Sequence, residues 1–234
     1  MIYILANDRK QKILAHLNQH VRATLEELQS LTDSSVSTIR RDLNELEEDQ
    51  LLRRIHGGAE LLQDFSTELT MIEKYSKNVQ EKFIIAKKAV KKIANGDTIY
   101  LDAGTTTGAL IPEMNQLNIH LTVVTSSATH ASLLTNEKIN VYILGGMIKK
   151  STDSVIGGLA LDQLRTYRFN VAFLGANGFD AQNGAMTPDS EEAAIKRQAV
   201  LQSQQSYLLM DRSKLGQTSF VRFATKDEVE VITE

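Results

Sequence analysis

Cysteine is absent from the 234-residue chain. Its absence excludes disulfide bonds and thiolate metal sites, and it fits a reducing compartment. Long hydrophobic runs are absent as well, because no stretch of about 18 apolar residues is available for a transmembrane helix. The N-terminal stretch MIYILANDRK has an apolar patch too short for a secretory signal peptide. We therefore expect a cytoplasmic protein without a membrane partner.

A generally basic composition and the common nucleotide motifs are also missing. The formal net charge is −3, so any binding to nucleic acid must come from a local basic patch. Neither a Walker motif nor G-x-G-x-x-G occurs, which argues against a nucleotide site. The five histidines show no metal-ligand spacing. The sequence therefore predicts no metal and no cofactor.

The composition that is present indicates a globular protein with two unlike parts. The hydrophobic share of 42% and the charged share of 24% allow a sizeable core. Short helical patterns fill the start of the chain, and apolar strands alternate with helices in the rest. We expect a winged helix-turn-helix domain at residues 1–57, a polar linker at 58–78 with or without a short helix, and an α/β domain at 79–234.

Three short helices are predicted in the N-terminal part. Apolar residues at helical spacing mark the first, at about residues 7–19. The second begins at Thr24, which fits a capping box with Glu27. The third begins after Ser35, a good N-cap, and its apolar residues recur at i, i+4 and i+7. The following stretch, LLRRIHGGAE, predicts a two-stranded wing with a Gly-Gly turn.

The outer face of the third helix and the wing carry groups that can recognise DNA. Arginine binds guanine through two hydrogen bonds and asparagine reads adenine in the major groove, while basic wing residues suit phosphates or the minor groove. The alternative is a solvated amphipathic helix with internal ion pairs, because residues 1–62 hold 8 Lys/Arg against 10 Asp/Glu. The candidate DNA-contacting residues are Ser37, Arg40, Arg41, Asn44, Arg53, Arg54 and His56.

The stretch SSVSTIRRDLNELEEDQLLRRIHGGAE closely resembles the DNA-binding signature of the DeoR family of bacterial transcription repressors. That signature contains TIRRDL, then LE, then a wing of the form hydrophobic-Arg-x-His-Gly-Gly-Ala, and nearly every position is filled here. The resemblance implies that Ser37, Thr38, Arg40 and Arg41 face the DNA groove and that the basic wing residues contact the duplex. Double-stranded operator DNA is therefore an expected partner.

Six apolar segments separated by helical stretches predict a mostly parallel sheet in the second part. Helices are expected near residues 107–114, 128–135, 158–166 and 190–203. The fold class is therefore α/β, with helices on both faces of the sheet. The predicted strands are TIYLD, LTVVT, NVYILGG, NVAFLGA, SYLLMD and VEVIT.

Polar residues follow the predicted strands, at the edge where ligands usually bind in parallel sheets. The turn DAGTTT suits an anion, because the first N–H groups of a helix and its dipole favour negative charge. A phosphorylated sugar fits the whole set: N–H groups, hydroxyls and lysines for the phosphate, carboxylates and amides for the sugar hydroxyls. Each residue also has a structural interpretation, as a helix cap or a solvated charge. The candidate effector-binding residues are Asp102, Gly104, Thr105, Thr106, Thr107, Ser126, Ser127, Lys149, Lys150, Asn177, Glu191 and Lys214.

The order of these motifs resembles the effector domain of the DeoR family, which is Rossmann-like and related in fold to sugar-phosphate isomerases such as ribose-5-phosphate isomerase. Within the family, DAGTTT, GGMIKKSTDSVIG, TPDSEEAAIKR and DRSKLGQTSFVR look most like the fructose operon repressors of Gram-positive bacteria. This likeness implies a role in carbohydrate metabolism with fructose 1-phosphate as the effector. We also expect a homo-oligomer, either a dimer or a tetramer.

The sequence leaves three functions open. The leading hypothesis is a repressor, not an enzyme, that controls a sugar uptake and catabolism operon and is released from its operator by a phosphorylated sugar. The second is a sugar-phosphate isomerase with an added helical domain. That chemistry needs a carboxylate base beside the substrate carbon, and Asp102, Asp180 and Glu191 are the nominees. The third is a DNA-binding protein whose second domain serves oligomerisation alone.

Overall fold

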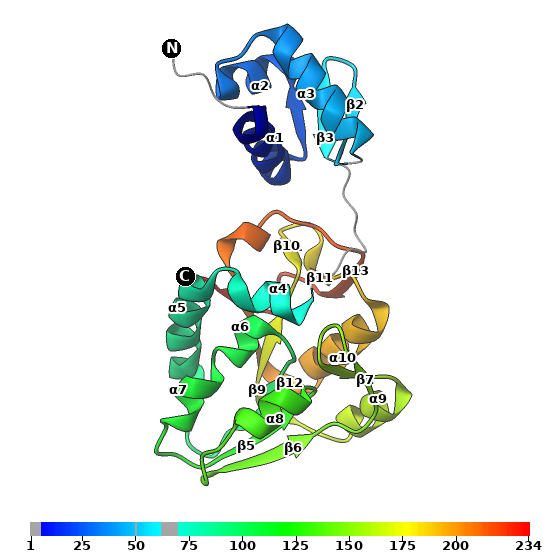
Figure 1. The fold of residues 1–234 in the computed structure, drawn as a ribbon. Coiled ribbons are helices and arrows are strands. Elements are labelled where there is room, and N and C mark those ends of the chain that lie inside the picture. The colour runs from blue at the N-terminus through cyan, green and yellow to red at the C-terminus, as the bar shows by residue number, and fades with distance from the viewer. Residues whose placement is uncertain (1–5, 50, 62–69) are drawn as a thin grey trace. The chain divides into compact units, whose positions relative to one another are not determined.

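The computed structural model describes residues 6–49, 51–61 and 70–234 of the chain. Two compact units are present, Met1–Asp64 and Phe65–Glu234 (Figure 1). Each has its own hydrophobic core. Within the described residues, we find no helix whose length and hydrophobicity would let it cross a membrane.

The N-terminal unit contains the three predicted helices and the predicted wing. At the start of α2, Glu27 N–H donates to Thr24 Oγ1 at 3.2 Å and Thr24 N–H donates to Glu27 Oε2 at 2.8 Å, so the capping box is confirmed. Ser35 caps α3 by accepting Thr38 N–H at 3.3 Å. The elements are α1 (Ala6–His20), β1 (Arg22–Thr24), α2 (Leu25–Thr32), α3 (Val36–Glu48), β2 (Leu52–Ile55) and β3 (Gly58–Leu61).

A buried ion pair joins α1 to α3 within this unit. Asp42 is 1% exposed and accepts from Arg9, with Arg9 Nη2 at 2.9 Å from Asp42 Oδ1. Asp42 belongs to the TIRRDL motif, yet its side chain points into the unit beside the buried Ile39 and Leu43. Asp42 therefore stabilises the fold of this unit, whereas Arg40 and Arg41 of the same motif are exposed.

The wing belongs to a three-stranded sheet, whereas the sequence predicts two strands. Strand β3 lies in the middle of a three-stranded sheet of order β1-β3-β2 and pairs with both neighbours. Residues 58–61, which we placed in the linker, therefore belong to the sheet. Gly58 permits this pairing because a Cβ there would lie 2.1 Å from the carbonyl oxygen of Ala23. Later in the predicted linker, Thr70 and Glu73 form a second capping box at the start of a short helix, α4 (Met71–Ser76).

The second unit alternates helices and strands as the sequence predicts. After α4 its elements are α5 (Val79–Ala89), η1 (Val90–Lys92), β4 (Thr98–Leu101), α6 (Thr105–Gly108), α7 (Ile111–Asn115), β5 (Leu121–Thr125), α8 (Ala128–Leu133), β6 (Ile139–Ile143), β7 (Met147–Lys149), β8 (Ser154–Ile156), α9 (Gly158–Arg165), β9 (Phe169–Gly175), β10 (Gly178–Asp180), β11 (Gly184–Thr187), α10 (Ser190–Leu201), β12 (Ser203–Leu209), η2 (Arg212–Lys214), β13 (Val221–Ala224) and β14 (Glu230–Ile232).

The six predicted strands form one parallel sheet of order β14-β12-β9-β4-β5-β6. Helices cover both of its faces (Figure 1). On β4, Ile99 and Leu101 pack with α5 and α7, while Tyr100 packs on the other side with α9 and α10. The alternation follows from the two-residue period of a strand. The predicted α/β class is confirmed.

Two small antiparallel elements were not predicted. The hairpin β7–β8 and the three-stranded sheet of order β10-β11-β13 consist of strands of three or four residues. Strands this short carry too few alternations to give a sequence signal. They matter for the site, because the loop between β7 and β8 and the residues just before β10 lie at the carboxyl edge of the main sheet.

Candidate functional site

The outer surface of α3 and the wing carries the predicted DNA-contacting residues. Half-buried Thr38 has its Oγ1 2.9 Å from Oγ of the N-cap Ser35, so its hydroxyl helps to order the helix start. The residues of this group that are exposed are Ser37, Arg40, Arg41, Asn44, Arg53, Arg54 and His56.

Contacts of Arg54 tie the wing to α3. Its Nη1 donates to Asn44 Oδ1, and its backbone N–H donates to Glu47 Oε1 at 2.7 Å. Across the hairpin, Arg53 Nη2 lies 2.9 Å from Glu60 Oε2. The helix and the wing are therefore joined by direct contacts.

A cavity lies in the second unit at the carboxyl edge of the sheet, where β4 and β9 end. The α6 turn forms one wall and begins at Gly104, whose φ of +136° favours glycine. Thr107 Oγ1 donates to the carbonyl oxygens of Asp102 at 2.8 Å and Gly104 at 3.0 Å, which closes the turn. The first N–H groups of a helical turn lack intrahelical acceptors and favour an anion.

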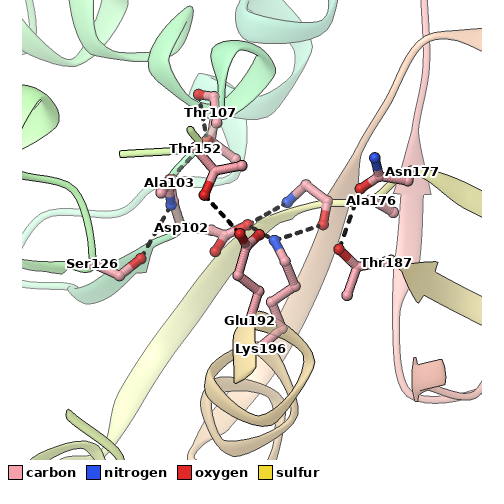
Figure 2. A network of polar contacts seen from close by, with 12 residues as sticks. Asp102, Ala103, Thr107, Ser126, Thr152, Ala176, Asn177, Thr187, Glu192 and Lys196 are labelled. Carbon is pink, nitrogen blue, oxygen red and sulfur yellow. Dashed lines mark hydrogen bonds and ion pairs between the residues drawn. The ribbon is translucent and has the colours of Figure 1, made fainter. Parts of the chain in front are cut away.

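A buried ion pair lies directly beneath this turn (Figure 2). Lys196 of α10 reaches Asp102 at the end of β4, and both side chains are less than a tenth exposed. Lys196 Nζ also donates to the Gly175 carbonyl at 3.1 Å, and Gly175 N–H donates to Asp102 Oδ2 at 2.9 Å. Burial raises the pKa of Asp102, and the positive charge of Lys196 opposes this shift.

Glu192 presents a second carboxylate to the cavity from the first turn of α10. Its Oε1 accepts from Thr152 Oγ1 at 2.6 Å and from Lys149 Nζ at 2.9 Å (the Thr152 bond is drawn in Figure 2). Lys149 also pairs with Asp189, the N-cap of α10, at 2.9 Å. These contacts fix the side chain of Glu192. The positive charge of Lys149 offsets the negative charges of Glu192 and Asp189.

Lys214 completes the cavity from the 3₁₀ turn that follows β12. Its Nζ donates to the Ala176 carbonyl at 2.9 Å. Burial lowers the pKa of Lys214 to about 8; the charge of Asp211 opposes this shift, and those of Lys74, Lys82 and Lys196 add to it. Positive charge is thus crowded around the cavity, and an anion would relieve the repulsion.

The structure brings together only some of the predicted effector-binding residues. Asp102 lies beneath the turn, and Ser126 Oγ accepts Ala103 N–H at 3.2 Å, so both support the loop rather than line the cavity. Ser127 caps α8 and donates to Asp153 Oδ2 at 2.5 Å. Those that line the cavity are Gly104, Thr105, Thr106, Thr107, Asn177 and Lys214.

Three other predicted residues lie elsewhere. Lys149 is held by its two carboxylate partners, and Lys150 is exposed on the loop after β7. Glu191 is exposed, whereas the adjacent Glu192 is buried and lines the cavity. The choice of Glu191 needs correction to Glu192, because the orientation of α10 on the sheet turns Glu192 inward.

Five cavity residues with side chains larger than that of alanine were missed by the sequence reasoning. Glu192 and Lys196 are four residues apart, the spacing that puts two side chains on one helix face, so this pair gave a usable signal. Met71 and Lys74 lie in a segment without a motif, whereas Thr152 lies inside the stretch GGMIKKSTDSVIG and was not selected from it. Within the described residues, no group of three His, Asp or Glu side chains is arranged to hold a metal ion. The missed residues are Met71, Lys74, Thr152, Glu192 and Lys196.

Comparison with family models decides the classification. Residues 77–234 match the DeoR C-terminal sensor domain, and residues 9–65 match the DeoR-like helix-turn-helix domain. The chain belongs to the DeoR family of transcriptional regulators. This confirms the resemblance carried by the TIRRDL motif and by the order of the later motifs. It also agrees with the prediction that the protein is a regulator and not an enzyme.

Individual members of this DeoR family match over nearly the whole chain. The uncharacterized HTH-type transcriptional regulator FruR of Bacillus subtilis (strain 168) is 43% identical over 230 residues, which is 98% of this chain and 91% of the relative. A lactose phosphotransferase system repressor of Staphylococcus epidermidis is 35% identical, covering 96% of this chain and 90% of its own.

Solved structures show more distant likenesses to this DeoR-family chain. Ribose 5-phosphate isomerase A of Methanocaldococcus jannaschii aligns with a TM-score of 0.45 and 20% identity over 59% of this chain and 55% of its own. The eIF2B delta subunit of Chaetomium thermophilum aligns with a TM-score of 0.51 and 14% identity, over 96% of this chain and 71% of its own. These likenesses concern the fold alone.

Lys196→Met is expected to destabilise the second unit, because it leaves Asp102 buried without its cation. Removing one partner of a buried pair costs about 3–5 kcal/mol. The control Arg197→Met breaks a partly exposed pair with Glu228 and should cost at most about 1 kcal/mol. Urea unfolding measures both losses.

Adding Asp102→Asn to Lys196→Met should recover part of the loss, because the unpaired charge is removed. If the double variant is no more stable than Lys196→Met, then lost packing explains the effect and the ion pair does not.

Proposed function

We propose that the protein represses an operon for the uptake and catabolism of a sugar, with fructose the leading candidate. A phosphorylated sugar such as fructose 1-phosphate releases it from operator DNA. The observation that carries this proposal is the cavity where the α6 turn, Lys196 and Lys214 meet. The names of two relatives support it, since one is called FruR and the other a lactose phosphotransferase system repressor.

The cavity offers complementary groups for both halves of a sugar phosphate. The N–H groups of the α6 turn and the hydroxyls of Thr105 and Thr106 suit the phosphate, with Lys214 supplying positive charge. Asn177 and Glu192 suit the sugar hydroxyls, because an amide and a carboxylate can both accept hydrogen bonds from them. A phosphate dianion would also relieve the repulsion that lowers the pKa of Lys214.

The DNA-binding surface completes the proposed repressor. We assign Ser37, Thr38, Arg40, Arg41 and Asn44 to the major groove, and the wing residues Arg53, Arg54 and His56 to phosphates or the minor groove. A dimer or tetramer presents at least two such surfaces to an operator. Effector binding then shifts the population of oligomer geometries away from the one that fits DNA. The cytoplasm is where such a regulator meets both ligands.

The isomerase alternative lacks support from the carboxylates. Glu192 is held by Thr152 and Lys149, and Asp102 is held by Lys196. Asp180 accepts backbone N–H groups of its own turn, such as that of Gln182 at 2.7 Å. The family assignment to transcriptional regulators points the same way.

Two substitutions are expected to separate the two activities. Arg41→Ala should weaken operator binding by about 1–3 kcal/mol if its guanidinium reads a base, and it should leave effector binding unchanged. Lys214→Met should keep operator binding and lose release by fructose 1-phosphate. Gel shifts on DNA selected by the protein from a random pool, together with calorimetry, measure both.

The matched control is Lys150→Met, which removes an exposed lysine outside the cavity and should change neither activity. A thermal-shift panel of fructose 1-phosphate, fructose 6-phosphate, glucose 6-phosphate and inorganic phosphate identifies the effector. A ligand at 100 times its Kd adds about 2.7 kcal/mol of stability. If no sugar phosphate alters unfolding or operator binding, the effector role is wrong and a domain for oligomerisation alone is favoured.

Effector affinity is expected to fall as the pH rises from 7 to 9. The pKa of Lys214 is about 8 in the empty cavity, and a bound phosphate raises it, so binding above pH 8 takes up a proton. Phosphate esters are dianions across this range, since their second pKa is about 6. The loss should approach about tenfold at pH 9. Calorimetry at both pH values tests this, and Lys214→Arg, which stays charged, should flatten the profile. Constant or rising affinity of the unsubstituted protein would contradict the assignment.

A further inference from the structure

The short helix α4 occupies a special position in the chain. It is the first described element after residues 62–69, which follow the DNA-binding unit in sequence. It also forms part of the cavity wall, through Met71 and Lys74, and packs on α6, which holds the anion-binding turn. The segment that leads out of the DNA-binding unit therefore contributes side chains to the candidate effector site.

The cavity is too small for a sugar phosphate as it stands. Its volume is about 40 Å³, enough for about three ordered waters and well below the roughly 300 Å³ at which small-molecule pockets begin. Full enclosure of a sugar phosphate would therefore require one wall to move. The question is which wall is held least firmly.

Most of the walls are anchored to the sheet. Lys196 is locked to Asp102 and the Gly175 carbonyl, and Glu192 is locked to Thr152 and Lys149. Lys196, Asp102 and Glu192 are buried, and breaking a buried pair is costly. Moving α10 or the ends of β4 and β9 would therefore cost free energy and weaken binding.

The hydrogen bonds of α4 are made to the β7–β8 loop and to α5. Met71 N–H donates to the Ser151 carbonyl at 3.2 Å, and buried Lys82 donates to the carbonyls of Lys74 and Lys77. Met71 and Lys74 are half-buried and Tyr75 is exposed. A shift of α4 would therefore leave the strands of the main sheet and the Lys196–Asp102 pair in place.

The positive charge of Lys74 makes the position of α4 sensitive to an anion in the cavity. Its charge acts on Lys214 across the cavity and, with Lys82 and Lys196, disfavours the protonated form of Lys214. A phosphate between these lysines replaces repulsion by attraction. Because Lys74 is carried by α4, this change in sign acts on the position of the helix.

We propose that Lys74 contacts the phosphorylated effector directly, and that the resulting shift of α4 transmits occupancy of the cavity to the chain segment that leads to the DNA-binding unit. This inference rests on the proposed function, and it names the residue that couples the effector site to DNA release.

The test compares Lys74→Met with Lys77→Met in the full chain, using fructose 1-phosphate. Lys77 is a matched control because it ends the same helix, carries the same charge and is exposed outside the cavity. Calorimetry gives the Kd of each variant, and gel shifts measure operator release at a concentration that saturates that variant. We expect Lys74→Met to bind about tenfold more weakly and to retain operator even when saturated. Lys77→Met and the charge-conserving Lys74→Arg should release it.

Amide hydrogen exchange of the unsubstituted protein gives a readout that needs no variant. Fructose 1-phosphate should change exchange in α4, where Lys74 N–H is bonded to the Thr70 carbonyl at 3.0 Å. Unchanged exchange in α4 on saturation would overturn the coupling. Wild-type affinity and wild-type operator release in Lys74→Met would also overturn the coupling. The proposed function would still stand in that case if Lys214→Met abolished release. An unsubstituted protein that binds none of the sugar phosphates in the panel would overturn both proposals.

Discussion

The ion pair between Lys196 and Asp102 is the interaction on which the second unit depends. It joins α10 to the end of β4, and its hydrogen bonds with Gly175 add the end of β9. Both charges are buried, so each is tolerated only because the other is present. The pair fixes three elements at one point. Because the α6 turn starts two residues after Asp102, the ion pair also fixes the position of this turn.

The balance of buried charges also determines which kind of ligand the cavity favours. Its carboxylates are engaged by internal partners, Asp102 by Lys196 and Glu192 by Lys149 and Thr152. The pKa of Lys214 is lowered to about 8, which reflects the energetic cost of holding its positive charge in this setting. An arrangement with surplus positive charge and occupied carboxylates favours holding an anion over removing a proton from carbon. The chemistry of the site therefore agrees with a family of regulators.

The N-terminal unit uses a buried ion pair in a comparable way. Arg9 and Asp42 connect α1 to the inner face of α3, which fixes the rotation of that helix about its axis. Its outer face then presents Arg40, Arg41 and Asn44 to solvent, and the contact between Asn44 and Arg54 aligns the wing with it. In both units, a buried charge pair sets the orientation of a helix, and the helix presents the functional groups.

The sequence by itself determined the classes of element and their order. Capping residues, helical spacing and apolar runs predicted α2, α3 and the six parallel strands, because these signals are local. The prediction of an anion at DAGTTT rests on the same kind of local signal, a glycine and hydroxyl residues at the start of a helix. Only the tertiary structure decided which side chains meet. Neighbours on a helix such as Glu191 and Glu192 differ by about 100° in direction, and the packing of α10 on the sheet determines which of them faces the cavity. Lys74 and Lys214 are 140 residues apart in sequence, and no local pattern relates them. Their common cavity follows from the parallel sheet, which gathers distant segments at one edge.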